Sequence, residues 1–280
     1  MNEAQIAEWN GEQGRRWVEL QRAMDAMLEP FSQAALQAAA AQPGEKVIDI
    51  GCGCGSTSLA LARAVAPHGS VLGVDVSQPM LVAARELAAS VDGLNLSFTE
   101  ADAADADLPH DHDLLFSRFG LMFFATPAAA LRHLRGALRP LGRCAFVCWR
   151  APRNNAWAMT PLVAARAALG VTPPPADPLA PGPFAFADDK HLHDLLREAG
   201  FSRIDIRSSD AMLRLGATAR GAAEHSARIG PVSRLVREAG AAKEALIVEA
   251  IEQVLTPLAG ADGSIKLAGS VWVVTASNAG

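Results

Sequence analysis

Three glycines at alternate positions, Gly51, Gly53 and Gly55, separate two stretches of regular pattern. Before them, the β-branched run Lys46–Ile50 predicts a buried strand, and after them residues 58–65 predict a helix. A strand that turns through glycines into a helix presents backbone N–H groups and a helix N-terminus at the edge of a parallel sheet. Open α/β folds bind their ligands there, so this stretch predicts a ligand site.

The charge around the glycines indicates which ligand fits. The spacing is Gly-x-Gly-x-Gly, whereas a dinucleotide site has Gly-x-Gly-x-x-Gly. Asp49 precedes the loop, and residues 47–62 contain no Lys or Arg. A carboxylate without a nearby cation repels phosphate and suits a ligand that carries an ammonium or sulfonium group. We therefore expect Asp49 at the mouth of the loop, facing a cationic ligand.

Two later predicted strands are also followed by acids. The run Val71–Val76 contains Asp75, and a third strand predicted at residues 94–98 precedes Asp102. A carboxylate after the second strand of such a fold can accept hydrogen bonds from both hydroxyls of a ribose. An adenosine with a zwitterionic, cationic tail describes S-adenosylmethionine, which is the cofactor we expect.

The segment Val47–Gly55, Asp75 and Asp102 resemble the cofactor motifs of class I S-adenosylmethionine-dependent methyltransferases. The resemblance covers roughly residues 45–149 and implies that the glycine loop holds the methionine moiety. It also implies that Asp75 binds the ribose and Asp102 the adenine amino group. The cofactor-binding residues predicted in this way are Asp49, Gly51, Cys52, Gly53, Gly55, Asp75, Val76, Met80, Ala101, Asp102, Ala103 and Ser117.

The fold expected is α/β, with a Rossmann-like, mostly parallel sheet of seven strands and helices on both faces. The last strand, predicted at residues 270–276, would run antiparallel between the fifth, 144–149, and the sixth, 203–207. We expect one methyltransferase domain over residues 1–280, organised as a helical cover (1–42), a cofactor-binding core (43–149) and substrate-side insertions (150–187 and 208–268). The first insertion is rich in proline, including residues 173–175, and is predicted to form a lid.

Two local features bear on the cofactor pocket. The segment between Trp9 and Trp17 contains two glycines, so it should break or bend, and the resemblance implies that it closes over the cofactor. Ser77 is predicted to cap a helix that extends to about Ser90. Met80, in the first turn of this helix, either packs on the adenine or belongs to the core.

Residues for the transfer step are harder to assign. The stretch Ser117–Phe124 follows the fourth strand but lacks the Asn/Asp-Pro-Pro-Tyr/Phe motif of enzymes that methylate nucleic-acid or protein amino groups. Arg118 either holds a substrate carboxylate or pairs with a loop acid. Methyl transfer does not require a base, the chain has no tyrosine, and His225 is the one candidate base we name.

Composition argues against several other classes of function. A net charge of -5 and a pI near 5.8 give no basic footprint for nucleic acid or membrane. The first residues lead us to expect no signal peptide, and the sequence contains no apolar run of membrane-spanning length. The four cysteines (52, 54, 144 and 148) fit neither a disulfide framework nor a metal site. We expect a cytoplasmic enzyme, a monomer or homodimer, that methylates a small molecule at oxygen, nitrogen or carbon.

Two alternatives remain open. The first is a nicotinamide-dependent reductase on the same kind of sheet, which the glycine spacing and the anionic loop disfavour. The second is a protein that binds S-adenosylmethionine without catalysing transfer.

Overall fold

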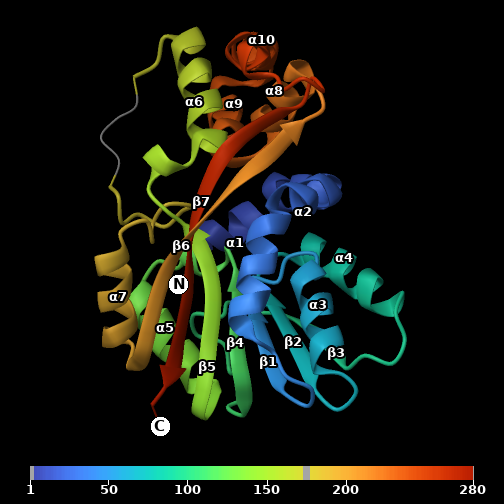
Figure 1. Ribbon diagram of the computed structural model, residues 1–280, viewed down its shortest axis with the longest axis vertical. Helices are drawn as coiled ribbons and strands as arrows, with labels where there is room; N and C mark the ends of the chain where they lie inside the picture. Colours follow the sequence, from blue (N-terminus) through green and yellow to red (C-terminus); the bar gives the residue numbers. More distant parts are fainter. Residues whose placement is uncertain (1–2, 173–176, 280) are drawn as a thin grey trace. The chain divides into compact units, whose positions relative to one another are not determined.

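A computed structural model of the chain describes residues 3–172 and 177–279. Its centre is a seven-stranded sheet with the strand order β3-β2-β1-β4-β5-β7-β6 (Figure 1). The strands are β1 Lys46–Ile50, β2 Ser70–Asp75, β3 Leu96–Glu100, β4 His112–Arg118, β5 Leu138–Trp149, β6 Phe201–Gly216 and β7 Ile265–Asn278. The α-helices are α1 Glu3–Asn10, α2 Glu12–Ala39, α3 Ser56–Val65, α4 Gln78–Ala89, α5 Pro127–Gly136, α6 Ala156–Leu169, α7 Asp189–Glu198, α8 Ala219–Arg228, α9 Gly230–Ala239 and α10 Glu244–Leu255. Short 3-10 turns are η1 Leu121–Phe123, η2 Pro152–Asn154, η3 Ala241–Lys243 and η4 Thr256–Leu258.

The strands β1 to β5 are parallel, and their order reverses between β1 and β4. From β1 the chain moves outward through β2 to β3, and it then returns to the other side of β1 as β4. Because such crossovers are right-handed, α3 and α4 lie on one face of the sheet and α5 on the other. The carboxyl ends of β1 and β4 therefore meet at the reversal, where open α/β sheets leave room for a ligand.

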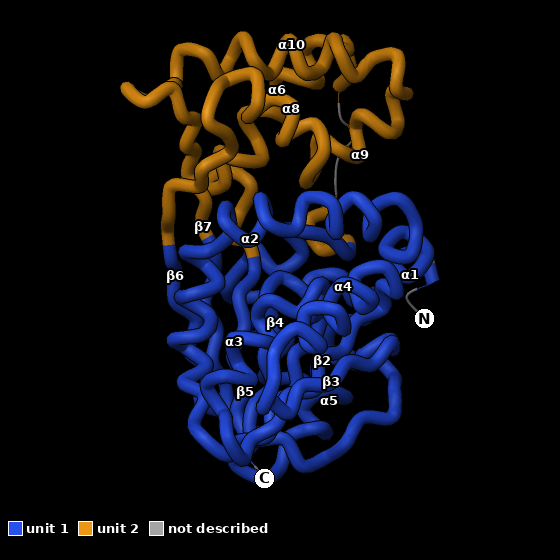
Figure 2. The backbone as a smooth tube through the Cα atoms, turned by 90° about the vertical axis from the view of Figure 1, so that its right-hand side faces the viewer, with its two compact units in different colours: residues 1–148, 181–209, 271–280 blue, residues 149–180, 210–270 orange. Residues whose placement is uncertain are grey.

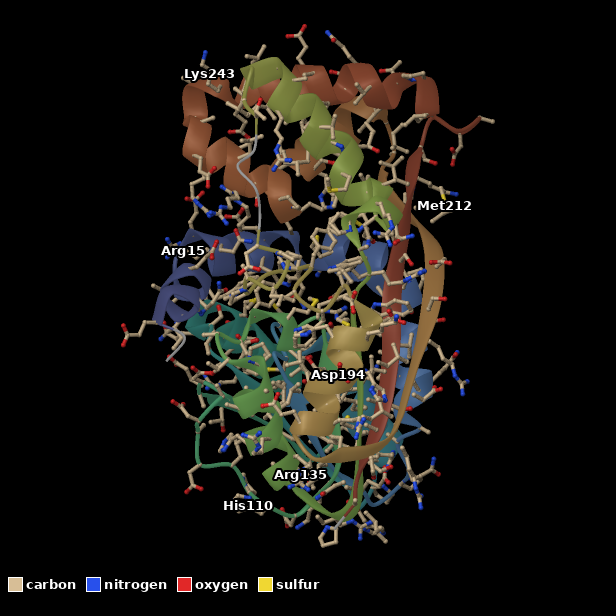
Figure 3. All side chains as sticks on the ribbon, turned by 90° about the vertical axis from the view of Figure 1, so that its left-hand side faces the viewer. Arg15, His110, Arg135, Asp194, Met212 and Lys243 are labelled. Carbon is tan, nitrogen blue, oxygen red and sulfur yellow. The ribbon has the colours of Figure 1, made fainter. Side chains whose placement is uncertain are left out.

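The seventh strand lies between the fifth and the sixth, as predicted. Asn278, the last residue of β7, donates from Nδ2 to the main-chain oxygen of Leu138, the first residue of β5, at 3.0 Å. Arg150, just past the end of β5, donates from its main chain to Ser270 in the middle of β7, also at 3.0 Å. This pairing is antiparallel, and the arrow of β7 also runs opposite to that of β6 (Figure 1). Arg135 of α5, labelled in Figure 3, donates to the Asn278 side chain at 2.9 Å and so anchors the end of the strand.

Two strand predictions need correction in the first half of the chain. The third strand is not residues 94–98 but Leu96–Glu100, because its register with β2 pairs Val71 with Leu96. The fifth begins at Leu138 rather than at 144. Residues 139–142, which have the composition of a turn, instead form an irregularity in the pairing between β4 and β5, with Leu141 at a φ of 65°.

The sixth and seventh strands are much longer than predicted. β6 covers Phe201–Gly216 instead of 203–207, and β7 covers Ile265–Asn278 instead of 270–276. Most side chains of β6, an edge strand, are partly or fully exposed, so apolar alternation does not mark its length. The predicted insertion 208–268 consequently begins and ends within these two strands.

The chain divides into two compact units (Figure 2). The first comprises Met1–Cys148, Pro181–Ser209 and Val271–Gly280, and the second Trp149–Ala180 and Asp210–Ser270. In the second unit α10 packs on α6 and α8, and the fully buried Asn155 accepts from the Trp157 indole at 3.2 Å. Much of both predicted insertions falls in this unit, while a single domain over 1–280 stays a prediction.

Pro173–Pro175 of the predicted lid lie outside the described residues. Within the described ranges, no helix is both long and apolar enough to cross a bilayer.

Candidate cofactor site

The glycine loop joins β1 to α3 with all three glycines at positive φ. The values are 69° at Gly51, 55° at Gly53 and 83° at Gly55, a region that side chains disfavour. The amide of Gly51 donates to the oxygen of Val74 at 2.8 Å, so the loop begins pinned to β2. At Gly53 a Cβ would meet nothing nearer than the Met80 sulfur at 3.8 Å, which leaves this side of the loop open to a ligand.

The glycine loop also touches the loop that follows β4. A Cβ on Gly51 would lie 2.7 Å from the Cα of Gly120, and one on Gly120 would lie 2.6 Å from the oxygen of Ile50. Ser117 is fully buried beside this contact, where its hydroxyl donates to Ile50 at 2.7 Å and accepts from the Gly120 amide at 3.2 Å. The hydroxyl of Ser117 thus links the end of β1 to the loop after β4 by hydrogen bonds. Its predicted contact with the cofactor stays a prediction. Sequence reasoning missed Gly120, since a contact between β1 and β4 leaves no local signal.

Asp75 ends β2 and faces the glycine loop. Its Oδ2 accepts from the Gly53 amide at 2.8 Å, and its Oδ1 accepts from the Ser77 amide at 2.9 Å. Burial raises the pKa of the Asp75 carboxyl, and the backbone donors of Ser77, Gly53 and Val76 oppose that rise. A carboxylate has about four acceptor positions, so each oxygen retains capacity for a hydroxyl donor. The structure therefore brings together Gly53 and Asp75, two of the predicted site residues.

Asp49 lies beneath the loop and is fully buried, not at its mouth as expected. Its Oδ2 accepts from the hydroxyls of Ser58 at 2.6 Å and Thr57 at 2.9 Å, while its Oδ1 has no hydrogen-bond partner among the described residues. Burial raises the pKa of the Asp49 carboxyl to about 6 against the opposing effect of those hydroxyls. The carboxylate thus ties β1 to the first turn of α3, because the helix begins directly over the strand end.

Other predicted residues line the same edge of the sheet. Met80 is 5% exposed and lies beside Gly53. Cys52 is also buried, and burial raises the pKa of its thiol well above the usual range. The amide of Ala101 donates to the Asp75 main chain at 3.0 Å, and Asp102 accepts from the Ala104 amide at 3.0 Å in the turn that follows. The end of β3 is in this way bound to the end of β2.

Arg118, at the end of β4, forms an ion pair with Asp25 of α2. Both terminal nitrogens of its guanidinium lie 3.0 Å from Asp25 Oδ1. The same group donates to the hydroxyls of Ser32 at 3.0 Å and Ser56 at 3.4 Å. Of the two alternatives for Arg118, pairing with an acid is observed, although the acid lies on a helix and not on a loop. The guanidinium joins α2, the start of α3 and β4.

The N-terminal helices pack against the turn that follows Asp75. The expected break falls at Gly11, between α1 and α2, and the indole ring of Trp9 packs edge-on against Trp17 and Phe123 at centroid distances of 5.9 and 5.7 Å. Ser77 occupies the N-cap position of α4 as predicted, but its side chain makes no capping bond. Its hydroxyl instead donates to the Trp9 main-chain oxygen at 2.7 Å.

His225 lies on α8, in the second unit, whereas the cofactor-binding residues named above lie in the first. Burial lowers the pKa of its imidazole, and the neighbouring Arg228 lowers it further. A catalytic role for His225 stays a prediction.

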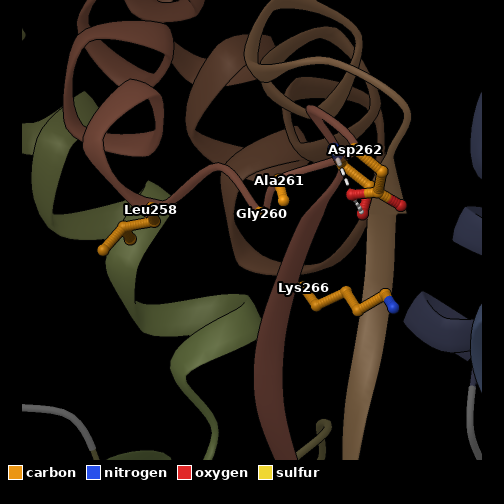
Figure 4. A pocket seen from close by; sticks show the side chains of 6 residues that line it. Leu258, Gly260, Ala261, Asp262 and Lys266 are labelled. Carbon is orange, nitrogen blue, oxygen red and sulfur yellow. Dashed lines mark hydrogen bonds between the residues drawn. The ribbon is translucent and has the colours of Figure 1, made fainter.

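Other sites in the described ranges offer less. An open surface hollow of the second unit is lined by Leu258, Gly260, Ala261, Asp262, Ser264 and Lys266 (Figure 4). The carboxylate of Asp262 already accepts from the Ser264 hydroxyl and amide at 2.7 and 3.0 Å. No three His, Cys, Asp or Glu side chains between residues 3 and 172 or 177 and 279 gather closely enough to hold a metal ion.

The strand order and the glycine loop define an α/β protein of the Rossmann-like class, with the glycine loop at the β1/β4 reversal where such sheets bind ligands. A family model described as a methyltransferase domain matches residues 47–142. This range contains the glycine loop, Asp75, Asp102 and Ser117. Over this segment, about a third of its length, the chain matches a methyltransferase domain, and the sheet around it has the fold of S-adenosylmethionine-dependent methyltransferases.

Two named methyltransferases are distant relatives of this chain. The 2-phytyl-1,4-naphtoquinone methyltransferase of Synechococcus elongatus is 32% identical over 124 residues, which cover 44% of this chain and 53% of that protein. The nocamycin O-methyltransferase of Saccharothrix syringae is 29% identical over 194 residues, or 66% of this chain and 69% of that one. The chain thus spans about half the length of the naphthoquinone methyltransferase that it matches.

Solved structures share the fold. A putative methyltransferase from Bacillus halodurans has a TM-score of 0.56 at 17% identity, covering 88% of this chain and 98% of that one. The [4+2]-cyclase SpnF has a TM-score of 0.54 at 17% identity, covering 89% and 81% of the two chains. The fold is therefore compatible with more than one reaction, and a substrate must be argued from the site.

Proposed function

We propose that this chain is an enzyme that transfers the methyl group of S-adenosylmethionine to a small-molecule acceptor. The observation that carries the proposal is the Asp75 carboxylate, held by the amides of Gly53 and Ser77 at the end of β2 with acceptor capacity to spare. This arrangement suits the two hydroxyls of a ribose. The lack of Lys and Arg along residues 47–62 suits a cofactor with a positively charged tail.

In this proposal the glycine loop holds the methionine moiety, and Met80 with residues 101–103 forms the adenine side. The cofactor supplies an activated methyl group on a sulfonium, which a nucleophile displaces in line. The protein then contributes position and the exclusion of water. Arg118 is neutralised by Asp25, so the proposal gives it a structural part at the β4 end and no role in binding a substrate carboxylate.

The acceptor side of the proposal rests on apolar surroundings and on distant relatives. Phe119, Phe123 and Trp9 follow or pack beside the end of β4. One relative is named for a naphthoquinone and another for nocamycin, so an apolar, ring-containing small molecule is the acceptor class we favour. A cytoplasmic location is also part of the proposal, supported by free, buried thiols at all four cysteines.

Calorimetry tests the cofactor. We expect S-adenosylmethionine and S-adenosylhomocysteine to bind, and the nicotinamide dinucleotides not to bind. Binding of a nicotinamide with no binding of S-adenosylhomocysteine would overturn the proposal in favour of a reductase. Transfer of a labelled methyl group to quinol and phenol acceptors would then separate an enzyme from a protein that only binds the cofactor.

Replacement of Asp75 by alanine tests the observation on which the proposal rests. We expect Asp75→Ala to weaken binding of S-adenosylmethionine by roughly 2–4 kcal/mol, because two hydrogen bonds to a charged acceptor are lost. Asp107→Ala is the matched control, since Asp107 is an exposed acid of a nearby loop. Unchanged affinity in a folded Asp75→Ala protein would remove Asp75 from the site.

A further inference from the structure

Asn10, the last residue of α1, forms a two-sided clamp on the turn between β2 and α4. Its Nδ2 donates to the main-chain oxygen of Val76 at 2.7 Å, and its Oδ1 accepts from the main-chain amide of Gln78 at 2.9 Å. One carboxamide thus bonds both ends of the turn. The Ser77 hydroxyl between them donates to Trp9, the residue before Asn10.

The clamped turn is the one that fixes Asp75. The Ser77 amide, at its centre, donates to Asp75 Oδ1, while the Gly53 amide holds Oδ2 from the opposite side. The orientation of the carboxylate therefore depends on where Val76–Gln78 lies. The ordinary capping bond that would hold Ser77 in place is absent, because its hydroxyl serves α1 instead. The turn is thus held in part by α1, a helix that lies 66 residues earlier in the sequence and outside the sheet.

Packing keeps α1 in position for this contact. Gly14 of α2 is buried, and a Cβ there would lie 2.0 Å from the Trp9 oxygen and 2.7 Å from the Ser77 hydroxyl. The α1–α2 connection therefore lies directly against the turn.

From this geometry we propose that Asn10 is a positioning residue for the cofactor: docking of α1 on the Val76–Gln78 turn sets Asp75 for the ribose hydroxyls. The inference rests on the proposed S-adenosylmethionine site and adds to it a residue outside the segment that the methyltransferase family model matches. Because coupling is reciprocal, occupation of the site strengthens the docking of α1 by the same factor that docking strengthens cofactor binding.

Two substitutions separate the two sides of the clamp. Asn10→Ala removes both bonds to the turn, together with the bond from Nδ2 to the Ile6 oxygen of α1 at 3.1 Å. Asn10→Asp retains an acceptor for Gln78 but sets a carboxylate oxygen against the Val76 carbonyl. Gln33→Ala on α2 is the control, since Gln33 is exposed and its side chain donates to Glu29 one turn away, far in sequence from the clamp. We expect each Asn10 variant to bind S-adenosylhomocysteine roughly five- to ten-fold more weakly, while the control binds as the wild type does.

A ligand without ribose hydroxyls distinguishes positioning from general destabilisation. If Asn10 acts through Asp75, an S-adenosylhomocysteine analogue that lacks both hydroxyls should bind Asn10→Ala and wild type equally, because no contact with Asp75 remains to be lost. An equal penalty for both ligands would overturn the inference. So would affinity for S-adenosylhomocysteine within two-fold of wild type in a folded variant.

Hydrogen exchange without ligand tests the clamp independently of the proposed function. The amides of Ser77 and Gln78 should exchange faster in Asn10→Ala than in wild type. Unchanged exchange would overturn the clamp even if the cofactor binds. Failure of the wild-type protein to bind S-adenosylhomocysteine would instead overturn the proposed function, and the exchange result would still decide whether Asn10 positions the turn.

Discussion

At the scale of single residues, the site depends on two carboxylates with different environments. Asp75 is held by two backbone amides and keeps acceptor capacity on both carboxylate oxygens. Asp49 is sealed below the loop, with two hydroxyls on one oxygen and no partner for the other. The first arrangement suits ligand binding, and the second carries a cost of burial that depends on pH.

The raised pKa of Asp49 makes a prediction about stability. Its pKa is about 6 in the folded protein, against 3.8 for an ordinary aspartate, so the folded state binds more protons between these values. The contribution of Asp49 to the free energy of unfolding should therefore fall as pH rises from about 4 to about 6 and then level off. Asparagine at this position carries no charge. The free energy of unfolding of Asp49→Asn should therefore rise relative to that of wild type across this pH window, by up to roughly 3 kcal/mol above pH 6.

Urea unfolding of both proteins from pH 4 to pH 8 measures this difference. A constant difference across the range would mean that Asp49 does not titrate as its burial implies.

Gly53 gives a second prediction at this scale. Gly53→Val should abolish binding of S-adenosylhomocysteine, because its side chain fills space that only the Met80 sulfur approaches, at 3.8 Å. Gly44→Val is a matched control with a similar positive φ, 89° against 55°, and no atom within 4 Å of the added carbon. Both variants carry backbone strain of roughly 1–2 kcal/mol, so calorimetry should separate them by binding alone. If Gly53→Val and Gly44→Val bind S-adenosylhomocysteine with equal affinity, Gly53 serves the turn and does not face the ligand.

At the scale of elements, the site is an assembly of strand ends fastened by short polar and glycine contacts. The β1 and β4 loops touch at Gly51 and Gly120, and Arg118 connects β4 to α2 and α3. These contacts join segments up to 93 residues apart in sequence, as between Asp25 and Arg118. The shape of the site is therefore a property of several elements together.

Gly120→Ala tests the contact between the two loops. Its Cβ would lie 2.6 Å from the Ile50 oxygen and 3.0 Å from the Gly51 Cα, and neither backbone atom can move freely. We expect a loss of roughly 1–3 kcal/mol in unfolding free energy together with weaker cofactor binding. Gly136→Ala, at the end of α5, has nothing within 4 Å and should leave both quantities near wild type. Equal unfolding free energies of Gly120→Ala and Gly136→Ala would show that the loops after β1 and β4 can move apart without loss of stability.

At the scale of the whole molecule, the cofactor residues and the candidate base belong to different compact units. Every predicted cofactor contact lies in Met1–Cys148, whereas His225 lies in Asp210–Ser270. The two steps of the proposed reaction, binding and transfer, should therefore respond differently to mutation.

His225→Ala makes this separation measurable. We expect affinity for S-adenosylhomocysteine to remain within about two-fold of wild type, because no predicted cofactor contact is altered. If His225 acts as a base, turnover should fall by 10²-fold or more and lose its dependence on the histidine pKa. Turnover equal to wild type would remove His225 from the mechanism, and a large loss of affinity would contradict the assignment of the cofactor site to the first unit.

Local sequence signals were sufficient to predict the seven-stranded architecture, the glycine loop and Asp75. The reason is physical: a buried parallel strand, a glycine turn and an acid at a strand end each depend on a few consecutive residues. The class of fold and the cofactor followed from their order.

Tertiary structure alone decided the contacts made across the sheet. The apposition of Gly120 and Gly51, the pairing of Arg118 with Asp25 and the clamp of Asn10 on Val76–Gln78 join residues distant in sequence. Burial of Asp49 and the full lengths of β6 and β7 likewise depend on neighbouring elements. Whether a side chain is exposed, paired or pressed against another backbone is determined by packing, and no local pattern of residues encodes it.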